Sequence, residues 1–305
     1  MIAFFAALSA IVLAAFLSIL YVGPRMLLFP HRRTPEYYQQ KFGFSHPSQI
    51  GLDFKEGLLK TGDGISLSYW EIKPQDSNEH NGAVIYLHGI TDSKVSGLNY
   101  AKQLSGFCGR VFLIDMRRHG DSGGDYCTFG YYEKHDVVAL IDKIESECHS
   151  MDITLLGVSM GAAIAVQTAA IDKRVSRLIA VAPFYDLFSI ALDHQVRKIG
   201  IRSKVLLKLV LKRAEHLAKF KASEVSPADD IRRVDVPILI VHGEKDRSVK
   251  REYPERLKGL NKNARLMIVA DAGHVDVLEK GGKDYLKELV EFMRSDGSSN
   301  PLKSL

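Results

Sequence analysis

Short, continuously apolar runs recur along the chain. They occupy residues 83–87, 111–114, 153–156, 178–181, 238–241 and 266–269. Strands that are buried on both faces have this appearance, as in a parallel sheet covered by helices. Helical patterns separate most of the runs, at residues 131–148, 160–171, 252–260 and 284–293. The alternation predicts an α/β fold with a mostly parallel central sheet and helices on both faces.

Two segments depart from this alternation. Residues 54–59 and 65–72 flank the turn sequence Thr-Gly-Asp-Gly at 61–64, which predicts a hairpin of two short strands. The long interval between Pro183 and Pro237 has its own helical signature, and we interpret it as an inserted helical cap rather than a second domain. The predicted soluble units are a core at 53–184 and 235–294, a cap at 185–234 and a flexible polar tail at 295–305.

An uncharged apolar stretch of 21 residues occupies positions 2–22. As a helix it is long enough to cross the roughly 30 Å hydrocarbon layer of a bilayer. A cleavable signal peptide is the alternative, but no Lys or Arg precedes Arg25 and no small-residue cleavage site ends the run. A buried core helix is disfavoured because the run has no polar face. We therefore predict a transmembrane anchor at residues 1–24, with the lipid bilayer as a partner.

Basic residues follow the apolar stretch and bear on its orientation. Arg25, Arg32, Arg33 and Lys41 all lie after it, in a segment rich in Pro and aromatic residues. The positive-inside rule then predicts a single-pass protein whose body lies in the cytoplasm. Residues 25–52 are interpreted as a juxtamembrane connector.

The composition is that of an ordinary globular protein, with 46% hydrophobic and 25% charged residues. The net charge of +5 is mild, and no zinc-ligand spacing or aromatic-plus-basic motif occurs, so nucleic acid is not an expected partner. The three cysteines, Cys108, Cys127 and Cys148, predict neither a disulfide framework nor a metal site and fit a reducing compartment. Cys127 lies in a Gly-rich loop, where we expect an unreactive thiol.

A Gly-x-Ser-x-Gly pattern stands at residues 157–161, after an apolar run and before a helix of small residues. This is the context of a nucleophile elbow, in which the serine occupies a cramped strand-to-helix turn and its hydroxyl stands clear of the sheet. Glycines on either side remove side chains that would clash there, and the N–H groups of the helix point toward developing negative charge. Ser159 is therefore the candidate nucleophile.

A serine hydroxyl is a poor nucleophile at neutral pH and needs a base within hydrogen-bond reach. In elbow-type sites the chain order is serine, acid and histidine, each at the C-terminal end of a strand. Asp246 follows the fifth apolar run and His274 follows the sixth. We predict that His274 is the general base and that Asp246 orients it, with Asp186 and Glu244 as alternative acids. Weaker candidates for the base, each next to a glycine at a strand end, are His88, His119 and His242.

Acyl transfer also requires hydrogen-bond donors for the oxyanion of the tetrahedral intermediate. One predicted donor is the backbone N–H of Met160, the residue after the nucleophile. The other is expected in the loop after the run 83–87, and we assign it to the backbone N–H of Ile90. Because the backbone supplies the bond, the identity of the side chain at this position says little.

The chain resembles the α/β-hydrolase family, in its serine-hydrolase branch. The matching pieces lie at residues 88–89, 115–122, 157–161, 226–227, 242–246 and 273–274, within a stretch of roughly 54–293. The resemblance implies the α/β-hydrolase fold, and its membrane-anchored relatives include esterases, lipases and acyl-protein thioesterases. It also implies a structural role for the loop at 117–122. A serine at the elbow disfavours the dehalogenase and epoxide-hydrolase branches, and we identify no acidic pocket of the kind that peptidase relatives need.

The cap is strongly basic. Between Arg197 and Lys221 there are nine Lys and Arg residues against one acidic residue, Glu215, so the rest of the chain is net negative. At helical spacing Lys204, Lys208, Lys212, His216 and Lys219 share one stripe, and an apolar face is expected opposite, made of Leu206, Leu207, Leu209, Val210, Leu211, Leu217 and Phe220. One interpretation is a lid helix with solvated lysines. The other is a lid that rests on anionic lipid while its apolar face lines an acyl pocket.

Together these features predict a serine hydrolase that cleaves a carboxylic ester or thioester through an acyl-enzyme, without metal or cofactor. Two alternatives remain open. The same site could transfer the acyl group to an acceptor other than water, or the chain could be a catalytically silent hydrolase-like module that binds a ligand or partner. The presence of serine, aspartate and histidine together argues against silence. The sequence does not distinguish lipid, acylated protein or small ester as the substrate, and it does not give the oligomeric state.

Overall fold

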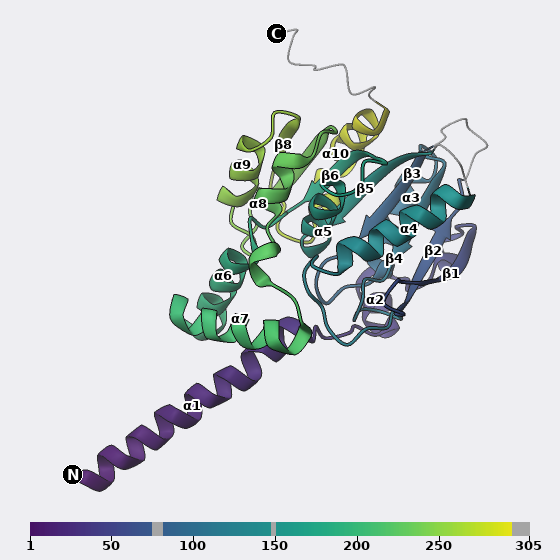
Figure 1. The fold of residues 1–305 in the computed structure, drawn as a ribbon. Coiled ribbons are helices and arrows are strands. Elements are labelled where there is room, and N and C mark those ends of the chain that lie inside the picture. Colours follow the sequence, from purple (N-terminus) through teal and green to yellow (C-terminus); the bar gives the residue numbers. More distant parts are fainter. Residues whose placement is uncertain (75–81, 148–150, 295–305) are drawn as a thin grey trace.

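One eight-stranded sheet forms the centre of the described part of the chain, residues 1–74, 82–147 and 151–294 of the computed structural model (Figure 1). The strands are β1 (Phe54–Lys60), β2 (Ser66–Ile72), β3 (Gly82–Leu87), β4 (Arg110–Ile114), β5 (Asp152–Val158), β6 (Val175–Val181), β7 (Ile238–Gly243) and β8 (Ala264–Val269). They are ordered β1-β2-β4-β3-β5-β6-β7-β8. β2 is antiparallel to both β1 and β4, and all other neighbours are parallel. The predicted mostly parallel sheet is confirmed.

Helices cover both faces of this sheet (Figure 1). The α-helices of the described residues are α1 (Ile2–Leu28), α2 (Pro35–Phe42), α3 (Leu98–Leu104), α4 (Glu133–Glu147), α5 (Met160–Ala169), α6 (Leu187–Ile199), α7 (Lys204–Ala218), α8 (Pro227–Asp230), α9 (Glu252–Gly259) and α10 (Val277–Arg294). α4 and α5 pack on one face, and α3 and α10 on the other. α2 and α3 lie where the sequence pattern predicts no helix, and α8 lies within the predicted helical cap.

The strands alternate between two apolar clusters, one on each face of the sheet. In β3, Ala83, Ile85 and Leu87 belong to one cluster, and Val84 and Tyr86 belong to the other. Successive side chains of a strand point to opposite faces, so both sets are buried at once. This two-sided burial explains why the strands appear in the sequence as unbroken apolar runs.

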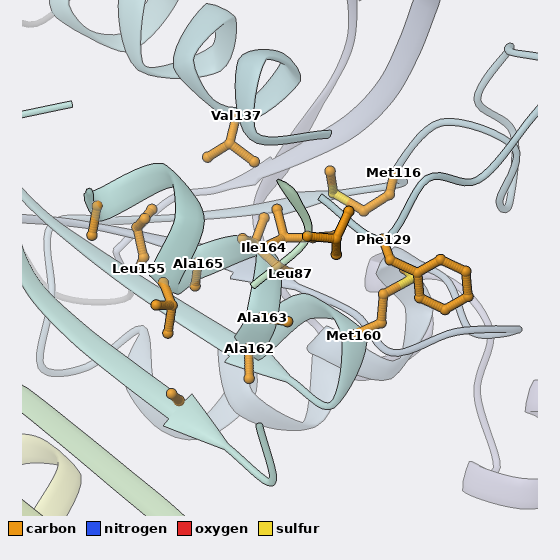
Figure 2. Packing of buried hydrophobic residues seen from close by; sticks show 14 of the residues in the cluster. Leu87, Met116, Phe129, Val137, Leu155, Met160, Ala162, Ala163, Ile164 and Ala165 are labelled. Atoms are coloured by element: carbon orange, nitrogen blue, oxygen red, sulfur yellow. The ribbon is translucent and has the colours of Figure 1, made fainter. Parts of the chain in front are cut away.

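α5 is buried along its whole length, and its small residues allow it to lie close to the sheet. Figure 2 shows Ala162, Ala163, Ile164 and Ala165 of this helix among large apolar side chains from neighbouring elements. At Gly161 an added Cβ would lie 2.0 Å from the carbonyl oxygen of Leu87. Only glycine permits this approach, and the helix that follows the elbow is therefore fixed against β3.

The segment between β6 and β7 carries α6 and α7, followed by α8. The side chain of Asp186 caps the N-terminus of α6 by accepting the backbone N–H of Ser189. In α7 the buried residues are Leu207, Val210, Leu211, Ala214 and Ala218. Leu209, which the sequence places on the inward apolar face, is instead 41% exposed. The inward face is therefore narrower than predicted, because positions 205 and 209 turn outward.

α1 begins with the uncharged stretch and extends beyond its end at residue 22. It continues through Pro24 to Leu28, whose side chain is fully buried and whose carbonyl accepts the Cys127 N–H at 2.9 Å. Figure 1 shows the first part of the helix projecting from the rest of the molecule. Within residues 1–74, 82–147 and 151–294, no helix meets the length and apolarity that a membrane crossing requires. The predicted transmembrane anchor at 1–24 is therefore not supported.

The predicted connector at residues 25–52 packs against the body of the protein. Arg32 donates to the carbonyl oxygens of Gly120 and Ser122, both at 2.9 Å. The buried Tyr38 of α2 donates its hydroxyl to Asp92 at 2.9 Å. The predicted flexible tail at 295–305, like Cys148, lies outside the described residues.

Candidate active site

Ser159 occupies the sharp turn between β5 and α5. Its backbone has φ 56° and ψ −113°, a left-handed conformation that is rare for a residue other than glycine. The turn is held to the sheet because the Ser159 N–H donates to the Val181 carbonyl at 2.8 Å. A Cβ on Gly157 would lie 2.2 Å from the Gly161 carbonyl oxygen, so the two glycines of the pattern face each other. The local geometry is that of the nucleophile elbow.

The structure brings Ser159, His274 and Asp246 together, although they are distant in sequence. The Nε2 atom of His274 lies 3.0 Å from the Ser159 hydroxyl oxygen. Its Nδ1 atom lies 2.7 Å from Asp246 Oδ2. An ionised carboxylate only accepts hydrogen bonds, so Nδ1 carries the proton and Nε2 is left to accept the serine proton. This is the tautomer that a general base requires.

Asp246 is buried and held as a carboxylate. Its Oδ1 atom accepts the backbone N–H groups of Ser248 at 2.7 Å and Val249 at 2.9 Å. Burial acts to raise the pKa of Asp246, but the hydrogen bond and positive potential of His274 and the two backbone donors outweigh it. The pKa of Asp246 is therefore lowered, and the group is ionised at neutral pH.

The alternative acids are engaged elsewhere. Asp186 accepts the N–H and the hydroxyl of Ser189, at 2.7 and 2.8 Å, as the cap of α6. Glu244 is exposed and accepts the N–H of Asp271 at 3.1 Å. Among the described residues, neither carboxylate has a polar contact with His274. The structure thus favours Asp246 over both.

Three further histidines lie near the site, and none contacts Ser159. His88 accepts the Met116 N–H on Nε2 at 3.0 Å and lies with Nδ1 2.8 Å from the Gly89 carbonyl oxygen. His119 is buried, and burial lowers its pKa to about 3. His242 is also buried, with Nδ1 3.8 Å from Asp246 Oδ2, and burial lowers its pKa as well. The burial and contacts of these three side chains are those of structural histidines.

Both residues predicted to supply oxyanion donors lie near the nucleophile. Met160 is its neighbour in the chain, and the loop that carries Ile90 is its neighbour in space. Met160 follows Ser159 directly at the start of α5, and Gly89 lies so close that an added Cβ would be 3.5 Å from the Ser159 Cβ. The Gly89 carbonyl is fixed by the His88 ring and by the Asp92 N–H at 3.2 Å. In a trans peptide the N–H points opposite to the C=O, so these contacts orient the Ile90 N–H. Its role as an oxyanion donor stays a prediction.

Lys94 is a buried, ion-paired residue for which the sequence gives no periodicity or motif signal. Its side chain is 2% exposed and its ammonium lies 2.6 Å from both Asp115 and Asp121. Arg117 forms a second buried pair with Asp136 at 2.6 Å. These pairs anchor the loop after β4, in agreement with the structural role that the resemblance implies for residues 117–122.

The described cysteines are buried thiols. Burial raises the pKa of Cys108 to about 12 and also raises the pKa of Cys127 well above its ordinary value. The sulfur of Cys127 lies 3.5 Å from the sulfur of Met160, within the apolar cluster beneath the elbow. An undissociated thiol is a poor nucleophile, which agrees with the unreactive thiol expected at Cys127. In the described ranges, no group of three or more His, Cys, Asp and Glu side chains is arranged to bind a metal ion.

Comparison with known families agrees with this geometry. The model of the serine aminopeptidase S33 family matches residues 78–226, and the model of the α/β hydrolase fold family matches residues 204–281. Together they extend over the elbow, the cap and the strand ends that carry Asp246 and His274. The chain belongs to the α/β-hydrolase family.

Similar proteins occur in bacteria and in human. The uncharacterized protein YqkD of Bacillus subtilis is 27% identical over 259 residues, covering 83% of this chain and 79% of that protein. Human protein ABHD12B is 24% identical over 229 residues, covering 68% of this chain and 61% of that protein. Among solved structures, the esterase Pf2001 of Pyrococcus furiosus has a TM-score of 0.68 at 24% identity, covering 88% and 97% of the two chains. This last likeness establishes the fold.

Proposed function

We propose that the protein is a serine hydrolase that cleaves a carboxylic ester or thioester through an acyl-enzyme on Ser159. The observation that carries the proposal is the continuous hydrogen-bonded series from Ser159 through His274 to Asp246, at 3.0 and 2.7 Å. The contact of Nδ1 with the Asp246 carboxylate favours the tautomer in which Nε2 can accept the serine proton. The fold, shared with solved esterases, supports the same reaction class.

In the acylation step, His274 Nε2 removes the hydroxyl proton as Ser159 Oγ attacks the carbonyl carbon of the substrate. The carbonyl oxygen becomes an oxyanion, which the N–H groups of Met160 and Ile90 stabilise. His274 is then an imidazolium, and the Asp246 carboxylate 2.7 Å away stabilises its charge. When the intermediate collapses, the bond to the leaving group breaks and His274 Nε2 returns the proton to the leaving alcohol or thiol.

Deacylation repeats these steps with water as the nucleophile. His274 removes a proton from water, the acyl bond to Ser159 breaks, and the serine oxygen recovers its proton as the carboxylic acid leaves. An alcohol, amine or thiol in place of water would make the same site an acyltransferase. The catalytically silent alternative is disfavoured by Asp246, because a scaffold without chemistry has no use for a buried carboxylate aligned on a histidine.

A fluorophosphonate probe tests the nucleophile directly, since it phosphonylates only an activated serine. We expect labelling of the full chain, and loss of labelling and of ester and thioester hydrolysis in Ser159→Ala. A triad serine typically contributes on the order of 10⁴-fold or more in rate. The matched control is Ser146→Ala, an exposed serine on α4 whose hydroxyl donates to the Lys143 carbonyl at 2.7 Å. Retained turnover in a folded Ser159→Ala protein contradicts the proposal.

The place of the protein in the cell stays a prediction. The sequence favours a bilayer as partner and the cytoplasm as the location of residues 53–294, on the basis of the uncharged stretch and of the basic residues after it. Fractionation of expressing cells, with protease protection of the intact cells, tests both parts.

A further inference from the structure

The outward face of α7 combines apolar and cationic side chains. Val205 is 71% exposed and Leu209 is 41% exposed, and they lie one turn apart on the same side of the helix. Lys204, Lys208 and Lys212 flank them as an exposed row, offset by one residue. The buried face of α7 is apolar as well, so the helix has two apolar edges, and only one of them contacts the protein.

The cations on this face are not neutralised by the protein. Among the residues that the structure describes, Lys204, Lys208, Lys212 and Arg213 have no carboxylate within 4.0 Å. Glu215, the one acidic residue of this segment, accepts the Ala222 N–H at 2.9 Å instead. The free positive charge of the cap is thus concentrated on the side that carries the exposed apolar residues.

α1 adds exposed apolar surface at the end of the molecule where it meets α7. It packs on α7 at Gly23, where an added Cβ would lie 3.0 Å from Val210, and Figure 1 shows the two helices meeting at one end of the molecule. The neighbouring α1 residues Tyr21, Val22 and Met26 are all exposed. Apolar side chains of two elements therefore lie close together at this end.

From this arrangement we propose that the outward face of α7 is a docking surface for anionic lipid, with Val205 and Leu209 entering the acyl boundary and Lys204, Lys208 and Lys212 contacting lipid phosphates. Amphipathic interfacial helices bind membranes through this combination of apolar area and cationic charge. A purely electrostatic partner such as nucleic acid would leave the apolar pair exposed. An apolar partner alone would leave the lysines without counter-charge. This surface contact is separate from the reaction proposed for Ser159 and does not depend on it.

Tryptophan fluorescence tests the contact in the full chain at the site itself. The native Trp70 is buried and gives a constant background, whereas Val205→Trp places an exposed indole on the proposed surface. We expect its emission to shift to shorter wavelength with vesicles of phosphatidylcholine and phosphatidylserine, and far less with phosphatidylcholine alone. The shift should reverse as salt is raised, because surface charges are screened over about 8 Å at physiological ionic strength. Leu209→Trp provides a second reporter if Val205→Trp does not fold.

A position-matched control separates docking from general adsorption. Leu58 is 74% exposed, nearly the same as Val205. It lies on the edge strand β1, whereas α7 belongs to the segment between β6 and β7. Leu58→Trp should not shift with either vesicle.

The charge requirement is tested in the Val205→Trp background. Replacing Lys204, Lys208 and Lys212 together with Gln should weaken partitioning to the anionic vesicles on the order of 100-fold, since each lysine near such a surface contributes about a factor of five. The matched control replaces three exposed lysines elsewhere, Lys102, Lys258 and Lys262, and should leave partitioning nearly unchanged.

Three outcomes overturn the proposal. A shift of equal size with phosphatidylcholine alone would show apolar insertion without charge recognition. A shift that grows with protein concentration in the absence of vesicles would identify a second copy of the chain as the occupant. No shift with anionic vesicles in either reporter variant would show a solvated face. Because these measurements use no substrate, none of them affects the test of the proposed hydrolase function.

Discussion

Asp246→Asn is the substitution whose effect follows most directly from the geometry of the site. The Oδ1 atom of Asp246 accepts two backbone N–H groups, those of Ser248 and Val249, and Oδ2 faces Nδ1 of His274. An asparagine has one acceptor oxygen, and the two backbone donors require it at the Oδ1 position. Its NH₂ group then faces His274, so Nδ1 must accept, Nε2 must carry the proton, and Nε2 can no longer remove the proton of Ser159.

The expected loss is about 10⁴-fold in kcat, the size of effect that a wrongly placed imidazole proton produces in a serine triad. Folding should be retained, because the side chain keeps its shape and its two backbone hydrogen bonds. Steady-state hydrolysis of an activated ester and of its thioester analogue measures the loss, and circular dichroism verifies the fold.

The two alternative acids supply matched controls. Asp186→Asn should retain activity, with stability lowered by at most about 1 kcal/mol, because asparagine also caps helices well. Glu244→Gln changes an exposed side chain and should be close to neutral. If Asp246→Asn were fully active and Asp186→Asn inactive, the orienting role would belong to Asp186 and the tautomer reasoning would be wrong.

Gly161→Ala should abolish activity and lower the midpoint of thermal unfolding, because the alanine Cβ would lie 2.0 Å from a backbone carbonyl oxygen. The control Gly259→Ala places its Cβ in open space and should be neutral or slightly stabilising. Lys94→Met should destabilise the protein by about 3–5 kcal/mol in denaturant titration, since it leaves the buried carboxylate of Asp115 without its partner; an unchanged midpoint would contradict this. The pKa of Asp246 is lower in the folded protein than its ordinary value, so its contribution to stability is present above the unfolded pKa, about 3.9, and is lost as pH falls through the folded pKa. The fall in stability with acidification should therefore be shallower in Asp246→Asn than in the native chain, and parallel curves would show that Asp246 does not contribute.

The sheet and the site residues were predictable because both depend on local patterns. Strands buried on two faces leave unbroken apolar runs, and parallel strands bring their C-terminal ends to one edge of the sheet. Ser159, Asp246 and His274 each follow such a run, so their convergence follows from the topology alone. The sequence predicts Asp246 as the orienting acid, but it keeps Asp186 and Glu244 as alternatives, because their exclusion depends on which carboxylates are already engaged by other partners. The sequence signal for the engagement of Asp186 is its own position directly before a helical run, where aspartate is a preferred N-cap residue.

The features that were missed depend on contacts between distant segments. The extent of α1 is one such feature. Its C-terminal part is fixed by Gly23 against Val210 and by Leu28 in the core. Neither contact can be inferred from the apolar content of residues 2–22. The buried Lys94 is another, since its counter-charges lie in the loop after β4. In α7 the predicted face was too wide, because hydropathy gives the number of apolar residues and not how many of them a partner helix covers.

The contact between α1 and α7 has a consequence for packing. Gly23 approaches Val210 so closely that not even a methyl group could be added without displacing its neighbour. We therefore expect a larger residue at position 23 to displace Val210, so that a change made in α1 also disturbs α7. Because α7 belongs to the segment between β6 and β7, the contact ties the packing of the N-terminal helix to that of the cap.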